Sequence, residues 1–478
     1  MASKRVRIFT CAQNGAKPHE HFLAGLETLA NQYHTDIEIG VTNGKKTTSR
    51  RGKDSDEAEV LDPILREKTV VLFEEDKTNK GKVKVNSNLY VRNFPVKAQQ
   101  MIPLTSYDRF VKVDKSAIMF SPKMMLQCQA NLGDIPKILH STGAVTRPNY
   151  KNNSWGVKAT LDHTLGALLV EVENDNIFHL RQIVPNGQGV FYDLGVRYDG
   201  QKSPVRERVE ALIPGDWHTG STEPSVRDAT YRLMRELDPR KLVVQDLCDS
   251  KSISHHNEKD IIYKALLAVL EKNDLHKEIL ACRFELETFL KKGGEDMQIL
   301  IPRGNHDDHI TRYLQEGRFK DDPVNYFFAL ALSREEQEGR YCLEEGMNYL
   351  LKRAETNPSD FRKSAVEYAK TLKRLENVRF LGKSESCKIH GVEVGCHGDL
   401  GANGTRGSIT SVSKTLGNCF VGHSHTPGIF RDAWQVGTST YLRLGYNEGP
   451  SSWLNTAGII HPNGKKQLIN FINGKYKP

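Results

Sequence analysis

The chain lacks the features that mark membrane-spanning, secreted or disulfide-rich proteins. No stretch of its 478 residues approaches the ~18 consecutive apolar residues of a membrane helix, which excludes an integral membrane protein. The N-terminus, Met1 to Arg7, is basic but has no apolar segment behind it, so a secretory signal is not expected. The eight cysteines are scattered without a CxxC pair, which argues against a zinc ribbon or a disulfide scaffold. We therefore expect a cytoplasmic protein without a membrane partner.

A strong charge of one sign is also absent. The 67 basic and 59 acidic residues give a formal net charge of +8, which permits a polyanionic partner without requiring one. A basic loop from Lys45 to Lys53 is either a nucleic-acid contact or a solvated turn. The segment from Gly40 to Thr47 does not have the GxxxxGK[ST] spacing of a nucleotide-binding P-loop.

Length and periodicity predict an α/β protein with more than one unit. Residues 1–205 are predicted to form a mixed α/β domain of unknown role, because strand-like and helical patterns alternate there without a chemical motif. Residues 206–478 then follow a βαβ rhythm, with a charged helical insertion at about 315–377. The strands expected in this second unit are 209–213, 242–244, 297–301, 378–381, 392–395, 419–422 and 441–444.

Five short polar blocks each fall at the end of a predicted strand. They are Gly215-Asp216-Trp217-His218, Gln245-Asp246, Gly304-Asn305-His306-Asp307, Cys396-His397 and Gly422-His423-Ser424-His425. Loops at the carboxyl ends of strands are where open α/β sheets place their sites. We therefore expect the polar side chains of these blocks to converge.

The donors in these blocks are too many for one tetrahedral ion with an open position. They suit two divalent ions that share one bridging carboxylate, as in two-metal phosphoesterases. Mixed imidazole and carboxylate donors favour manganese, iron or zinc over an oxygen-only magnesium or calcium site, and we expect Mn²⁺. The predicted donors are Asp216, His218, Asp246, Asn305, His397, His423 and His425.

The ordered blocks resemble the calcineurin-like metallophosphoesterase superfamily, whose pattern is DxH, GD, GNH[DE], a lone His and GHxH. The resemblance covers roughly residues 206–478 and implies a β-sandwich flanked by helices. It implies that Asp216, His218 and His425 hold the first ion, that Asn305, His397 and His423 hold the second, and that Asp246 bridges them. It further implies that His306 protonates or stabilises the leaving oxygen and that Asp307 orients His306.

The sequence departs from the family pattern at two places. Gln245 stands where the family has the glycine of GD, and Asp249 stands where double-strand-break-repair nucleases often have a histidine three residues after the bridging aspartate. His255 and His256 follow closely and are candidate substrate contacts, with an exposed loop as the alternative. Arg303 and Arg406 are further candidates for phosphate binding, with scaffold or solvated roles as the alternative.

These observations predict a two-metal phosphodiesterase that acts on DNA through a metal-bridging hydroxide. The unit at 1–205 and the helical insertion would provide extra surface, either for binding a polymer or for forming a homo-oligomer. In overall layout the chain more loosely resembles an early protein of tailed bacteriophages implicated in degrading host DNA, which would place it in the host cytoplasm. The alternatives are a phosphomonoesterase or small-nucleotide phosphodiesterase of the same superfamily, and a non-catalytic scaffold. All seven donor positions and His306 are filled, which argues against the scaffold.

Overall fold

The computed structural model describes most of the chain. The described residues are 5–42, 61–67, 70–73, 82–94, 96, 99–110, 115–133, 137–200, 202–294, 296–356, 375–383, 385–445 and 447–478. The basic loop at 45–53 lies outside them, as do residues 357–374 of the expected helical insertion. The described part is mixed α/β, as the sequence predicts.

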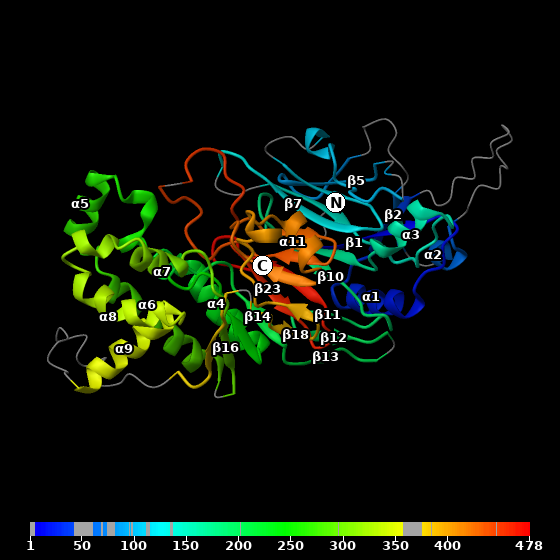
Figure 1. The fold of residues 1–478 in the computed structure, drawn as a ribbon. Helices are drawn as coiled ribbons and strands as arrows, with labels where there is room; N and C mark the ends of the chain where they lie inside the picture. The colour runs from blue at the N-terminus through cyan, green and yellow to red at the C-terminus, as the bar shows by residue number, and fades with distance from the viewer. Residues whose placement is uncertain are drawn as a thin grey trace.

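A six-stranded sheet lies near the middle of the molecule, in the order β17-β16-β15-β14-β23-β24 (Figure 1). Strands β14 to β17 run parallel to one another, whereas β23 pairs antiparallel with β14. The carboxyl ends of β14, β15 and β16 therefore meet at one edge of the sheet. The bounds are β14 Ala211–Ile213, β15 Lys241–Val243, β16 Gln298–Ile301, β17 Val378–Phe380, β23 Thr456–Ile460 and β24 Lys466–Asn470.

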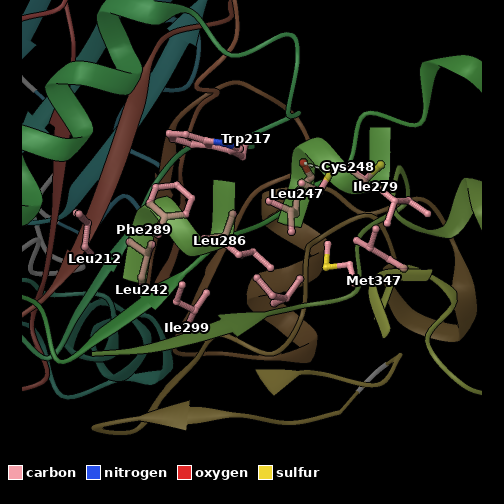
Figure 2. Close-up of a cluster of buried hydrophobic side chains, with 14 of the residues drawn as sticks. Leu212, Trp217, Leu242, Leu247, Cys248, Ile279, Leu286, Phe289, Ile299 and Met347 are labelled. Atoms are coloured by element: carbon pink, nitrogen blue, oxygen red, sulfur yellow. Dashed lines mark hydrogen bonds between the residues drawn. The ribbon is translucent and has the colours of Figure 1, made fainter. Parts of the chain in front are cut away.

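Helices cover one face of this sheet. Because successive strand residues point to opposite faces, Leu212, Leu242 and Ile299 face the helices while their neighbours face the other way. Figure 2 shows these three side chains packed with Leu286 and Phe289 of α6. The helices that contribute to this core are α4 Pro224–Leu237, α6 Leu275–Gly293, α7 Asp308–Gln315, α8 Tyr326–Gln337 and α9 Cys342–Thr356. Helix α5 Ile261–Val269 lies at one end of the molecule (Figure 1).

A second sheet covers the opposite face, so the two sheets form a sandwich. Ile213, Val243 and Leu300 of the first sheet share a core with Phe420 and Trp434 of the second. The second sheet has the order β18-β19-β20-β22-β21-β7-β8-β6-β5-β4. Its bounds are β4 Val83–Lys84, β5 Leu89–Arg92, β6 Ser116–Met119, β7 Met124–Gln129, β8 Lys137–Thr142, β18 Lys388–Ile389, β19 Val392–Glu393, β20 Cys419–Val421, β21 Gly428–Phe430 and β22 Ala433–Gln435.

Strands from both sides of the expected boundary at residue 205 share this second sheet. Strand β7 pairs antiparallel with β21, with Leu126 opposite Ile429 and Met125 opposite Phe430. A continuous hydrogen-bonded sheet thus joins the unit at 1–205 to the unit at 206–478. The division into these two units remains a prediction, but their described parts are in direct contact.

The remaining sheets belong mainly to the N-terminal unit. A five-stranded sheet in the order β10-β9-β1-β2-β3 packs one face on α1 and gives the other to the core of the sandwich. A three-stranded sheet has the order β11-β12-β13. The bounds are β1 Val6–Gln13, β2 Ile37–Thr42, β3 Val70–Phe73, β9 Ala167–Val172, β10 Phe178–Ile183, β11 Phe191–Asp193, β12 Val196–Tyr198, β13 Val205–Arg206, α1 Glu20–Gln32, α2 Pro63–Glu67, α3 Ser154–Leu161 and α11 Ile409–Thr415.

One expectation about secondary structure was wrong. Residues 441–444 form no strand, because the chain there follows turns and bends. Helices α8 and α9 lie within the expected helical insertion, and α6 and α7 pack into the same core as these two helices. The long helix α6 is held from its start by Asp274, whose side chain accepts a hydrogen bond from the Lys277 amide.

Candidate metal centre

Three parallel strands deliver the first donors to one edge of the six-stranded sheet. Asp216 and His218 follow β14, and Asp246 follows β15. The His218 amide donates to the Asp246 carbonyl at 2.8 Å, so the two loops stay in register beyond the strands. Asn305 and His306 follow β16. The parallel order of the strands therefore positions these side chains.

Apolar residues that alternate with the donors fix the direction of each loop. Trp217 is fully buried in the helix-side core, where its ring lies 4.8 Å from that of Phe289 (Figure 2). Leu247 and Cys248 are buried in the same core. Each anchor points its polar neighbour, Asp216, His218 or Asp246, away from the core and toward the other donors.

The last donors come from the second sheet. His397 lies in the loop after β19, and His423 and His425 follow β20. The Gly422 amide donates to the His397 carbonyl at 2.7 Å, which ties these two loops together. The site therefore lies at the ends of both layers of the sandwich.

Asp216, His218 and His425 form one buried group of donors. Nε2 of His218 lies 3.0 Å from Nε2 of His425, and Nε2 of His425 lies 3.4 Å from Oδ2 of Asp216. One donor atom from each residue lies within 4.8 Å of the other two. This trio coincides with the predicted ligands of the first ion.

Asp246 lies between this trio and the remaining donors. Its Oδ2 is 3.0 Å from Nε2 of His397 and 3.9 Å from Nε2 of His218. Asp216, Asp246 and His397 also offer three donor atoms within 4.8 Å of one another. Nδ1 of His423 lies 2.9 Å from Oδ1 of Asn305. The structure thus brings all seven predicted donors to one region, with Asp246 between His218 and His397.

Two glycines of the motifs make room for the carboxylates. A Cβ atom at Gly304 would lie 1.9 Å from Oδ1 of Asp246, and one at Gly422 would lie 2.0 Å from Oδ1 of Asp216. Neither glycine has a positive φ. Close approach to the two carboxylates, rather than backbone freedom, therefore requires glycine at both positions.

Several donor residues have a left-handed backbone. The φ angles are 47° at His218, 43° at Asp246, 73° at His423 and 57° at His425. Each non-glycine residue held in this region costs about 1–3 kcal/mol, and such residues cluster at functional sites. The fold thus directs these side chains inward at a cost in local stability.

The charges of the buried donors depend on one another. Burial raises the pKa of Asp216 to about 7. Burial has the same tendency at Asp246, but the charge of His397 outweighs it and holds the pKa of Asp246 well below its usual range. Burial tends to lower the pKa of His397, yet Asp246 raises it to about 10. Burial lowers the pKa of His218 and His425, so these imidazoles stay neutral, which is the form that binds a metal.

Buried polar atoms without partners provide a test of whether the cluster fits metal ions. Both carboxylate oxygens of Asp216 are buried and accept no hydrogen bond from the described residues. Nδ1 of His425 also lacks a hydrogen-bond partner among them, whereas Nε2 of His397 lies 3.0 Å from Oδ2 of Asp246. Buried polar groups in native proteins are normally satisfied. Unpartnered oxygens and nitrogens that face one another are therefore suited to divalent cations.

Asp249, rather than Asp307, lies against His306. Nδ1 of His306 is 3.1 Å from the Asp249 carbonyl oxygen and 3.4 Å from its Oδ1. Asp307 instead accepts hydrogen bonds from the Cys248 amide and the Tyr341 hydroxyl, both at 2.9 Å. The expectation that Asp307 orients His306 is corrected accordingly, because the Asp307 carboxylate is used to join the loop after β15 to helix α9. The sequence signal for Asp249 is its place three residues after Asp246.

The four candidate substrate contacts differ in their surroundings. Arg303 bonds Asp308 and Thr311, so its guanidinium is held within the scaffold. Arg406 is exposed and makes no ion pair with the described residues. The pKa of His423 is lowered mainly by burial and by the charge of His397, and the charge of Arg406 lowers it further. His255 and His256 lie in a short 3₁₀ helix, with their ring centroids 3.9 Å apart.

Comparison with known proteins links the chain to a bacteriophage. It is 28% identical to Protein A1 of Escherichia phage T5 in an alignment of 486 residues, which covers 98% of this chain and 82% of that protein. This similarity supports a phage origin. No protein-family model and no solved structure matches the chain. Among the described helices, none has the length and apolar composition needed to cross a membrane.

Proposed function

We propose that the chain is a two-metal phosphodiesterase of the calcineurin-like metallophosphoesterase superfamily and that its substrate is DNA. The observation that carries the proposal is the convergence of the seven donors, with unpartnered buried oxygens and nitrogens at their centre. The packing of two sheets face to face, with the donors at the ends of their strands, supports the same family.

The donor set defines how two ions would be held. Asp216, His218 and His425 would hold the first ion, and Asn305, His397 and His423 would hold the second. Asp246 would contribute to both. When bound, the ions supply positive charge to the phosphate and activate water for in-line attack on phosphorus. The mixture of imidazole and carboxylate favours Mn²⁺, with iron or zinc as alternatives.

His306 is the proposed proton donor to the leaving oxygen. Its amide donates to Oδ1 of Asp246 at 3.2 Å, which fixes its position beside the donor cluster. Asp249 contacts its Nδ1, which leaves Nε2 to carry a proton toward the substrate. Burial tends to lower the pKa of His306, but hydrogen bonding to Asp249 raises it to about 9, so the imidazole is protonated at neutral pH.

The choice of DNA over a small ester rests on the surroundings of the site. Arg406 offers an unpaired positive charge close to His423, where a phosphate next to the scissile one could bind. The ten-stranded sheet and the helical layer extend the surface on both sides of the strand ends (Figure 1). A polymer backbone uses such a surface, whereas a single phosphate needs only the metal centre.

The test is a gel assay of linear, circular and single-stranded DNA with Mn²⁺, with and without chelator. We expect cleavage that is lost on chelation and in Asp246→Asn, and retained in Asp228→Asn, an exposed carboxylate on α4. Turnover of nucleoside monophosphates without cleavage of DNA would favour the phosphomonoesterase instead. An absence of turnover on DNA, on monophosphates and on a chromogenic phosphodiester would contradict any catalytic role.

A further inference from the structure

Three histidines form a second cluster outside the proposed two-metal centre. His255 and His256 come from the 3₁₀ helix His255–Asn257, and His309 comes from the first turn of α7. The ring of His309 lies 5.1 Å from that of His255 and 5.9 Å from that of His256, measured between centroids. One nitrogen from each ring lies within 4.8 Å of the other two. The three imidazoles thus face a common point.

The histidine cluster contains buried nitrogens without partners. The side chain of His309 is only 5% exposed, and its Nδ1 makes no hydrogen bond with the described residues. Nδ1 of His255 is likewise buried and unpartnered among them. Burying an imidazole nitrogen without a partner is unfavourable, so two such atoms in one cluster of histidines suit a bound ligand.

We propose that His255, His256 and His309 bind a divalent transition-metal ion of the zinc class. Three imidazoles with a fourth position open are a known donor set for zinc. His256 is exposed, so the open position would face solvent. This proposal does not rest on the proposed function, because it uses none of the seven donors of the two-metal centre.

The electrostatic surroundings are compatible with a cation. Arg312 and Arg318 lie near the histidine cluster, but both pair with Glu316, at 2.6 and 2.9 Å. Arg318 also lies 4.0 Å from Glu258. The two positive charges are therefore offset by two carboxylates.

The histidine cluster is close to the proposed catalytic residue. The ring centroid of His309 lies 4.8 Å from that of His306. An ion held by the histidine cluster would therefore border the place where the leaving oxygen departs, and would carry charge to that end of the substrate. A phosphate bound by the same imidazoles is the competing occupant, and the experiment below distinguishes it from a metal ion.

The experiment counts zinc ions bound by the full-length protein after equilibrium dialysis. We expect His256→Asn to lose one ion per chain, or to bind it at least ~10-fold more weakly, because an exposed ligand is removed without disturbing the core. His309→Asn should lose the same ion. The control is His34→Asn, in the turn between α1 and β2, where asparagine tolerates the positive φ of 51°. It should bind as many ions as the wild type.

The outcomes separate this site from the two-metal centre. Asp216→Asn should weaken other ions and leave the ion of the histidine cluster in place. If His309→Asn does not fold by circular dichroism, His256→Asn decides alone. Zinc stoichiometry and affinity equal to wild type in a folded His256→Asn would overturn the proposal. Unchanged zinc binding together with weaker binding of inorganic phosphate would overturn it in favour of an anion site.

Discussion

Replacing Asp249 by asparagine should move the pH dependence of catalysis through His306. Because Oδ1 of Asp249 also lies 3.4 Å from Nδ1 of the proposed ligand His218, metal affinity is measured in the same variant. The substitution keeps the size of the side chain and its ability to accept a hydrogen bond from Ser221, which lies 2.5 Å from Oδ2. It removes the negative charge that lies 3.4 Å from Nδ1 of His306. If His306 donates a proton to the leaving oxygen, the charge of Asp249 helps to determine the pKa of His306 and therefore the highest pH at which the enzyme is active.

The size of the effect follows from the pKa of His306. The rise from 6.5 to about 9 corresponds to about 3 kcal/mol in favour of the protonated form, at 1.36 kcal/mol per pH unit. Asp246 also contributes, so we assign roughly half of this, about 1–2 kcal/mol, to Asp249. Because its pKa is raised, His306 keeps its proton below that pKa and loses it as the pH rises through that value. The alkaline limb of kcat should therefore move down by about one pH unit.

The assay is kcat against pH with a chromogenic phosphodiester and saturating Mn²⁺. We expect Asp249→Asn to match wild type at pH values well below the alkaline limb and to be ~10-fold slower at pH values above the pKa of His306 in both proteins. Bound cations lower the pKa of His306 in both proteins, so the difference between the two profiles is the quantity tested. Asp228→Asn is the matched control. A profile that coincides with wild type, with unchanged kcat, would refute the role of Asp249.

Three further predictions concern the metal centre and the substrate. Asp246→Ala should lower the affinity for both ions and the rate, whereas His306→Ala should keep both ions and lose ~10²–10⁴ in rate. Calorimetric metal titration and kinetics of the two variants test this, and a metal affinity equal to wild type in Asp246→Ala would exclude a bridging role. Gly304→Ala should lower metal affinity, because its Cβ would lie 1.9 Å from Oδ1 of Asp246, and an unchanged titration would refute this. DNA binding by His306→Ala should weaken with salt at a log–log slope of about −0.9 per phosphate contact, and a flat plot would argue against a polymer substrate.

The sequence alone determined which side chains were candidates for the proposed metal centre. Each block follows a short apolar strand, and the blocks after β14, β15 and β16 come from parallel neighbours. Parallel strands that alternate with helices place their carboxyl ends at one edge, so local pattern is enough to predict that Asp216, Asp246 and Asn305 meet. The spacing of two residues in Asp216-x-His218 is equally local, because alternate residues of an extended segment share a face.

Contacts between distant segments were decided only by the tertiary structure. The pairing of β7 with β21 joins residues about 300 positions apart, and no periodicity in either segment indicates its partner. The histidine cluster has the same origin, because His255 and His309 meet only through the packing of α7 on the 3₁₀ helix. Asp249 takes the place beside His306 because Tyr341 and the Cys248 amide hold Asp307 elsewhere. Local patterns fix which face a side chain lies on, but the partner it meets depends on how separate elements pack against one another.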